Sequence, residues 1–342
     1  MMSFQTIKQM VFLVIIFAVV LNFHIAFGSE DINLFRIGTG GKSGVYYPIG
    51  KIIAQGISNS SISIEKNEEK TTSTYLSFAQ NSGGSVDNVQ GIIAGEIEAG
   101  LVQADVASWA FRAAHVFKEN SKAQDIRAIA SLYPEKFQIV TRRDAKVGNV
   151  DDLRGKHISI DELGSGTLAV MRIVLEAHGL RETDLKPVYL KPVFTHDKIV
   201  SGELQGFVMM AGAPMEAVSQ LLNNGISLVP IAPAIASQIK TKYPYLVPGK
   251  IAANIYPGIP ETPTIQVHAL LVVHKAMDNE LVYKITAALW GKQTLSLLKA
   301  GHPQGKSIMP NTALTGVSIP LHPGAKKYYQ QHVDRFNASQ LK

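Results

Sequence analysis

Two short glycine-rich segments each lie where an apolar stretch gives way to a helical pattern. The first runs from Gly38 to Gly44 and reads Gly-Thr-Gly-Gly-Lys-Ser-Gly, and the second, about 125 residues later, is Gly164-Ser-Gly-Thr167. A glycine loop that enters a helix leaves backbone N–H groups unpaired at the positive end of the helix dipole. Both segments therefore predict sites for a carboxylate or another anion. The alternative is that each loop serves only chain geometry, since glycine is the usual residue at strained turns.

Several polar side chains near these loops could contact the same ligand. Tyr46 and Tyr47 follow the first loop, and one of them is expected to face the ligand and the other the core. Ser85 is either a ligand donor or a helix cap, and Gln103 ends a buried strand where its amide needs a partner. Asp105 fits a helix cap better than a counter-ion for a ligand ammonium. The predicted ligand contacts are Gly40, Gly41, Ser43, Gly44, Tyr46, Tyr47, Ser85, Gln103, Ser165, Gly166, Thr167, Gly212 and Pro214.

Common nucleotide and catalytic motifs do not fit the sequence. A P-loop ending at Ser43 would need its first glycine at Arg36, and the dinucleotide motif would need its third glycine at Ser43. The ten histidines form no H-E-x-x-H motif, and the chain has no Gly-x-Ser-x-Gly elbow. We therefore predict no catalytic residue, no metal ion and no cofactor.

The elements that must position these residues alternate between strands and helices. Apolar runs predict strands at 34–37, 99–103, 126–132, 137–141 and 157–160, and helical spacing predicts helices at 47–57, 106–118, 167–178 and 280–299. Strands that alternate with helices of this length are typical of βαβ units and parallel sheets. The sequence therefore predicts the α/β class.

The N-terminus has the pattern of an export signal. Lys8 precedes twelve apolar residues, 10–21, and Ala26-Phe27-Gly28 provides the small residues that a signal peptidase reads. Twelve apolar residues are too few to cross a bilayer core, which needs about 20. The chain has no cysteine and so no lipobox. We expect cleavage near Gly28 and release into the periplasm of a Gram-negative bacterium.

Composition indicates an ordinary globular protein. At 342 residues, with 46% hydrophobic and 18% charged residues, two domains are expected. The net charge is +6, but the basic residues are scattered, and the pair Arg142-Arg143 is followed by Asp144. This distribution does not form the basic stripe of a nucleic-acid-binding surface, so no nucleic-acid partner is expected.

Eight sequence blocks span nearly the whole mature chain and carry a resemblance to a known family. They are residues 38–50 (GTGGKSGVYYPIG), 83–89, 95–105, 132–135, 152–156, 164–167, 212–214 and 320–325. In these blocks the chain resembles the TAXI family of TRAP transporter solute receptors. In that family the receptor captures its solute outside the cytoplasm and passes it to a membrane permease.

The resemblance implies a type II periplasmic-binding-protein fold, with two Rossmann-like lobes, parallel-rich sheets and a two-segment hinge. On that basis we expect lobe 1 at residues 29–137 and 268–342 and lobe 2 at residues 138–267, with crossings near Phe137 and Gln266. It also implies a small anionic solute, either a glutamate-like amino acid or an organic acid, and TRAP permease subunits as partners. We expect a monomer that performs no chemistry; the alternative is a periplasmic enzyme on the same scaffold.

One segment departs from the family pattern. After the turn at 201–204, the family has an acidic residue, a small residue and an aromatic pair, whereas this chain has Gln205 to Met210. If this strand reaches the cleft, Met209 and Met210 make its wall softer and more apolar. The alternative is that both methionines fill the core.

Overall fold

The computed structural model describes residues 31–42, 44–66, 71–163 and 165–336. The predicted export signal at residues 1–28 lies outside this part of the chain, as do Ser43 and Gly164. Within the described ranges, no helix has the length and apolar character needed to cross a membrane.

One mixed sheet of eleven strands runs through the whole molecule. Its main path is β2 (Ser63–Lys66), β3 (Thr71–Gln80), β1 (Asp31–Gly38), β4 (Ala99–Gln103), β11 (Thr262–His274), β5 (Ile126–Arg142), β8 (Gly206–Ala211), β6 (His157–Ser159) and β7 (Lys186–Val188). Beside this path, β9 (Ile226–Leu228) pairs with β5, and β10 (Val247–Ile251) pairs with β11. Parallel pairs lie toward both ends, whereas β4, β11, β5 and β8 pair antiparallel in the middle.

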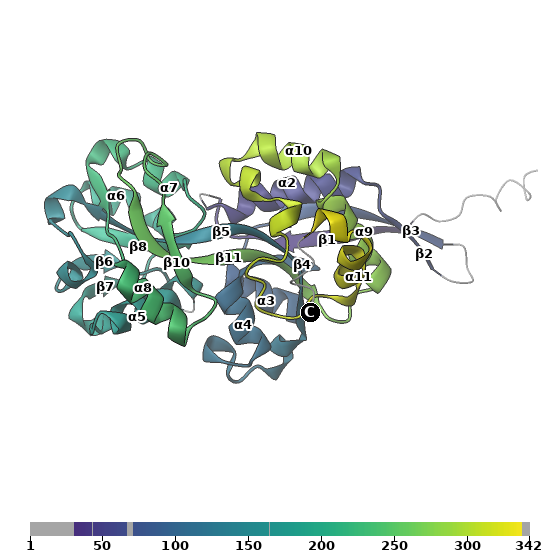
Figure 1. Cartoon of the computed structure of the whole chain (residues 1–342), viewed down its shortest axis with the longest axis horizontal. Coiled ribbons are helices and arrows are strands. Elements are labelled where there is room, and N and C mark those ends of the chain that lie inside the picture. The colour runs from purple at the N-terminus through teal and green to yellow at the C-terminus, as the bar shows by residue number, and fades with distance from the viewer. Residues whose placement is uncertain (1–30, 43, 67–70, 164, 337–342) are drawn as a thin grey trace, which may run out of the picture.

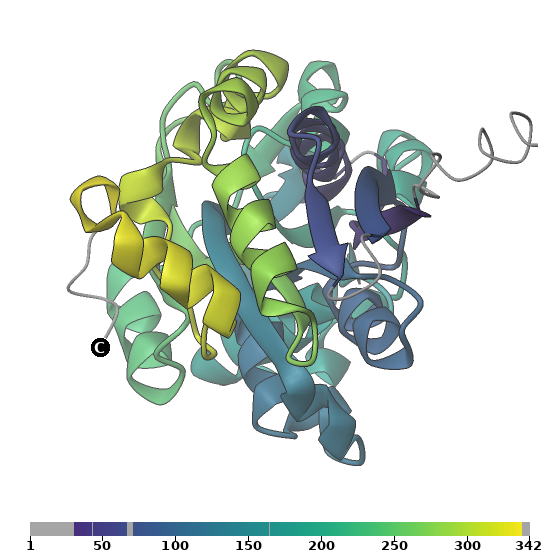
Figure 2. The same cartoon turned by 90° about the vertical axis from the view of Figure 1, so that its right-hand side faces the viewer.

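Helices cover both faces of the sheet and gather into two lobes (Figure 1). The helices of lobe 1 are α2 (Tyr46–Asn59), α3 (Ser85–Ala94), α4 (Ala104–Phe111), α9 (Asn279–Leu289), α10 (Lys292–Gly301) and α11 (Pro323–Gln331). Those of lobe 2 are α5 (Gly166–Ala177), α6 (His196–Val200), α7 (Glu216–Ser219) and α8 (Pro233–Lys242). Figure 2 looks at lobe 1 end-on and shows the C-terminal helices, in yellow-green and yellow, packed on its sheet. The expected α/β class is confirmed.

The two lobes are joined by the long antiparallel strands β5 and β11 (Figure 1). These strands pair with each other from Ile126↔His274 to Lys136↔Gln266. Beyond that point the backbone of residues 229–231 lies between them, because the N–H of Val229 bonds to Ile139 and the N–H of Ile231 bonds to Pro263. The expected crossings near Phe137 and Gln266 fall in this region, and the division into lobes at residues 137 and 268 stays a proposal.

The hydrophobic core is shared between the lobes on one face of the sheet only. On that face, side chains of α3 and α4 belong to the same buried cluster as those of α5 and α8. On the opposite face, the core under α2, α9, α10 and α11 is separate from the core of lobe 2. Trp109 on α4 reaches across and donates a hydrogen bond of 2.8 Å from Nε1 to the hydroxyl of Tyr245, after α8. The lobes are therefore in contact along the α4 and α8 side.

Four expected elements, two strands and two helices, differ in length from those observed. The predicted strands 126–132 and 137–141 are one strand, because Pro134 pairs opposite His268 where the ladder has an irregularity that tolerates a residue without an N–H. The helix expected at 106–118 ends at Phe111, since Ala113 and His115 adopt positive φ angles. The helix expected at 280–299 is divided into α9 and α10 at Gly291.

Candidate ligand-binding site

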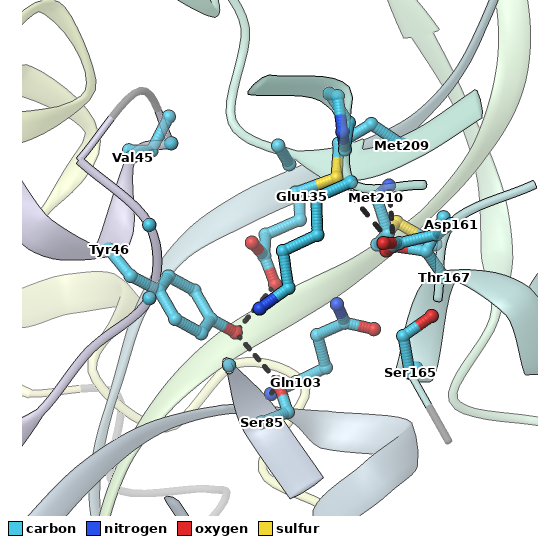
Figure 3. Close-up of a pocket in the computed structure, with 18 of the residues that line it drawn as sticks. Val45, Tyr46, Ser85, Gln103, Glu135, Asp161, Ser165, Thr167, Met209 and Met210 are labelled. Carbon is cyan, nitrogen blue, oxygen red and sulfur yellow. Dashed lines mark hydrogen bonds between the residues drawn. The ribbon is translucent and has the colours of Figure 1, made fainter. Parts of the chain in front are cut away.

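A cavity of about 90 Å³ lies between the two lobes, and both contribute to its wall (Figure 3). Lobe 1 supplies the loop before α2, the start of α3, the end of β4 and part of β5, whereas lobe 2 supplies the loop before α5 and the end of β8. Because one water needs about 10–15 Å³ of such space, the cavity takes roughly six to nine water-sized groups. A small metabolite of about that many non-hydrogen atoms would fill it.

Three helices begin at this cavity. Val45 precedes α2 and Gly84 precedes α3, and neither helix has a side-chain cap on its first N–H groups. Gly84 adopts a φ of 108°, a conformation that favours glycine, so the chain can turn into α3 here. The third helix, α5, is capped by Ser165, whose Oγ accepts from the N–H of Leu168 at 3.0 Å. The uncapped N–H groups at the starts of α2 and α3 therefore lie at the cavity, where they would stabilise a ligand carboxylate.

The lobe 1 wall of the cavity contains a buried carboxyl group. Glu135 on β5 is only 2% exposed, and its Oε2 accepts a hydrogen bond of 3.0 Å from the hydroxyl of Tyr46. That hydroxyl also lies 3.4 Å from Ser85 Oγ, which accepts from the backbone N–H of Gln103 at 3.0 Å. Figure 3 shows these side chains on one side of the cavity. A chain of hydrogen bonds thus fixes the wall from α2 to β4.

Burial raises the pKa of Glu135 in this wall and of the neighbouring Asp105, which does not line the cavity. Burial raises the pKa of Glu135 well above its ordinary value, the hydrogen bond from Tyr46 opposes that rise, and the nearby charge of Asp105 adds to it. Burial also raises the pKa of Asp105 to about 7. Apart from backbone N–H groups of its own turn, neither carboxylate oxygen of Asp105 has a hydrogen-bond partner among the described residues. Asp105 can therefore take up a proton near neutral pH, and burial favours the neutral form of Glu135 unless a cation pairs with it.

The lobe 2 wall combines a second carboxyl group with methionines. Asp161 adopts a φ of 70° and is 6% exposed. Burial raises its pKa, while the N–H of Glu162 and the hydroxyls of Thr167 and Ser165 hydrogen-bond to it and oppose that rise. The hydroxyls at the start of α5 therefore face a carboxylate of the protein itself.

Met209 and Met210 on β8 both line the cavity, as expected if the departing segment reaches the cleft. Thr167 holds them in place, because its Oγ1 accepts from the N–H of Met210 at 3.3 Å and lies 3.7 Å from the Sδ of Met209. Met215 adds a third thioether to the same side. This part of the wall therefore offers a polarizable, apolar surface.

One cationic side chain reaches the lining. Lys191 is paired through Nζ with the Oε1 of Glu162 at 2.9 Å, and its side chain is 30% exposed. It lies on the lobe 2 side, where the half-exposed Val193 also contributes to the wall. Lys191 thus offsets a neighbouring acid and provides a positive charge close to the cavity.

The family of the chain is shown by a match to a protein-family model over most of its length. The model of the NMT1-like family matches residues 37–332. The chain belongs to the NMT1-like family. Among solved structures, this NMT1-like protein is similar to a protein from Bordetella bronchiseptica RB50, with 15% identity over 87% of this chain and 88% of that one and a TM-score of 0.50.

Two further solved structures resemble this NMT1-like protein more weakly. One is the periplasmic aliphatic sulphonate binding protein SsuA from Escherichia coli, with 16% identity, coverage of 87% and 83%, and a TM-score of 0.44. The other is a TctC solute binding protein from Polaromonas, with 13% identity, coverage of 80% and 89%, and a TM-score of 0.44.

Most of the predicted contacts of this NMT1-like protein line the cavity. These are Gly40, Gly41, Gly44, Tyr46, Ser85, Gln103, Ser165, Gly166 and Thr167. Ser43 lies outside the described residues. Tyr47, Gly212 and Pro214 are not part of the lining, since Gly212 packs instead on Gln304 and Tyr133. Asp105 lies in the first turn of α4 and is not its cap, which is Gln103.

Several residues of the lining were not expected from the sequence. The most consequential are Glu135 and Asp161, because each places a carboxyl group in the cavity wall. Glu135 follows Pro134 within an apolar stretch, and this position was the feature of the sequence that could have indicated a buried carboxyl group. Among the described residues, no three His, Cys, Asp or Glu side chains are grouped so that they could hold a metal ion.

Proposed function

We propose that this protein is a periplasmic solute receptor of a TRAP-type transporter, within the TAXI group. It captures a small solute, a glutamate-like amino acid or an organic acid, and delivers it to the membrane permease. The observation that carries the proposal is the cavity between the lobes into which three helix N-termini open. Such helix ends bind carboxylates without needing arginine.

The arrangement of the lobes supports capture by closure. The hinge would be the β5–β11 ribbon, with lobe 1 at residues 29–137 and 268–342 and lobe 2 at residues 138–267. Gln103 and Val106 of lobe 1 approach Gly166 of lobe 2 so closely that a Cβ added there would lie 2.9 Å from each of them. A ligand in the cavity would therefore be enclosed from both sides, as a receptor requires.

The N-terminal sequence pattern and the family resemblance support a proposed location and proposed partners. Residues 1–28 would direct export and be removed, and the receptor would act as a monomer in the periplasm. The solute would pass to TRAP permease subunits, and the receptor itself would catalyse no reaction.

The test is thermal unfolding of the mature protein against a panel of amino acids and organic acids. A solute at 100 times its dissociation constant adds about 2.7 kcal/mol to the free energy of unfolding, which raises the melting temperature. Gly166→Ala should abolish most of that rise, because its new Cβ prevents the closest approach of the lobes. Gly148→Ala is the matched control, since the Cβ added in that loop meets only the Asp152 carboxylate at 3.6 Å.

The receptor proposal is rejected if no member of the panel raises the melting temperature of the wild-type protein. The location of the site is rejected if a solute binds and Gly166→Ala and Gly148→Ala respond to it equally.

A further inference from the structure

One hydrogen-bond acceptor in the cavity wall of lobe 1 lacks a donor in the described part of the chain. Gln103 is 6% exposed, lines the cavity, and its Oε1 has no hydrogen-bond partner among the described residues. In the same part of the chain, Tyr46 is the donor to the carboxyl group of Glu135. Figure 3 shows the Gln103 amide directed into the space between the two lobes. Buried acceptors of this kind are unfavourable unless a ligand or water donates to them.

Among the described residues, the opposite wall supplies no donor to the Oε1 of Gln103. Asp161 faces the cavity with another buried carboxyl group, and the hydroxyls of Thr167 and Ser165 are directed to it. Lys191 is paired with Glu162. A solute that carried only carboxylates would therefore face two carboxyl groups of the protein and would offer no donor to the Oε1 of Gln103.

A solute with one cationic group resolves this conflict. A protonated amine has three N–H donors and a positive charge, so it can satisfy Glu135 and Gln103 together. The N–H groups at the starts of α2 and α3 open into the same cavity and suit a carboxylate on the same molecule. The two kinds of site are complementary to the two ends of an amino acid.

Resting on the proposed receptor function, we propose that the solute carries a protonated amine held by Glu135 and Gln103, and is an amino acid and not an oxo acid or hydroxy acid. Glu135 is then the residue that determines this specificity. Its role is to bind the amine directly, while Tyr46 and Ser85 position its carboxyl group and the end of β4.

The test compares solutes that differ only at the amine. Glutamate and 2-oxoglutarate, alanine and pyruvate, and leucine and 4-methyl-2-oxopentanoate are titrated by calorimetry into the mature protein, refolded beforehand to remove bound solute. In each pair that binds, the amino acid should bind at least tenfold more tightly, because the oxo acid leaves buried acceptors unpaired.

Two substitutions test whether Glu135 determines the preference for the amino acid. Glu135→Gln preserves the shape of the side chain and should reduce the amino-acid preference at least tenfold. Glu176→Gln removes the same charge from an exposed position, where the residue pairs with Lys242, and should leave the preference unchanged. If Glu135→Gln does not fold, the wild-type comparison still decides whether an amine is required.

The outcomes separate the two proposals. An oxo acid that binds as tightly as its amino acid, or more tightly, overturns the amine assignment and leaves the receptor function standing. A preference that survives Glu135→Gln overturns the role of Glu135. Binding of neither member of any pair counts against the proposed class of solute itself.

Discussion

The contact between Trp109 and Tyr245 offers a test of the proposed lobe closure. Trp109 lies on α4 of lobe 1 and is 2% exposed, while Tyr245 belongs to lobe 2. If this contact forms only when the lobes are together, removing it destabilises the closed form alone. Tyr245→Phe is the smallest change that does so, because it deletes the hydroxyl and keeps the ring.

The size of the effect follows from the geometry of the pair. The hydrogen bond from Nε1 to the hydroxyl is 2.8 Å long, and the rings meet edge to face with their centroids 6.5 Å apart. Phenylalanine keeps the ring contact but leaves a buried indole N–H without a partner, which costs about 1–3 kcal/mol. If all of that falls on the closed form, ligand affinity decreases roughly 5- to 150-fold.

Tryptophan emission during a ligand titration measures this change. The chain has two tryptophans, and the second, Trp290, is fully buried in lobe 1 and donates to Tyr329 at 2.9 Å. Trp290 should therefore contribute a constant background, while the Trp109 signal changes as the lobes close. Tyr243→Phe is the control, because the Tyr243 ring lies 6.2 Å from that of Tyr245 and makes no hydrogen bond to Trp109 in the described structure.

One result would refute the reasoning. If Tyr245→Phe lowers the free energy of unfolding but leaves the affinity unchanged, the contact exists equally with and without ligand. The α4 and α8 side would then be a permanent joint between the lobes and would not report closure.

Two further substitutions test how burial affects the pKa of Asp105 and how closely Gly212 is packed. Because the pKa of Asp105 is raised to about 7 in the fold, the folded state binds more protons between about pH 4 and pH 7, so its stability falls as pH rises through that window. The loss over the whole window is about 4 kcal/mol, of which about 2.5 kcal/mol falls between pH 5 and pH 8. Asp105→Asn should remove most of that difference in urea unfolding at pH 5, 7 and 8; an unchanged slope would contradict the assignment. Gly212→Ala should lower stability by about 1–3 kcal/mol, because its Cβ would lie 2.8 Å from Gln304 Cγ. Gln304→Ala in the same chain should restore part of that loss, and purely additive effects would show that the two residues do not compete for space.

The sequence predicted the local units of the fold well. The strand, glycine loop and helix around Gly40 and the corresponding unit around Gly166 could be found because glycine punctuation and helical spacing are local signals. The same signals placed nine predicted contacts at the cavity lining.

Features that depend on distant partners could not be predicted. Glu135 and Asp161 were missed because acidic residues are usually exposed, and only the packing of both lobes buries them. Gly212 was expected at the ligand rim, but its surroundings are set by Gln304, a residue far along the chain. The continuity of β5 through Pro134 likewise depends on an irregularity opposite it on β11.

The facing residues Lys136 and Gln266 on β5 and β11 lie at the proposed boundary between the lobes, where the chain would leave lobe 1 and later return to it. Since the two residues are neighbours on adjacent antiparallel strands, a tight turn could join them, and β5 and β11 would become a plain hairpin. Every strand pairing between β1, β3, β4, β5 and β11 within lobe 1 would survive that excision. Under the proposed division, lobe 2 would be one continuous piece of chain inserted into a topologically complete domain, and its half of the cavity wall would come from that insertion alone.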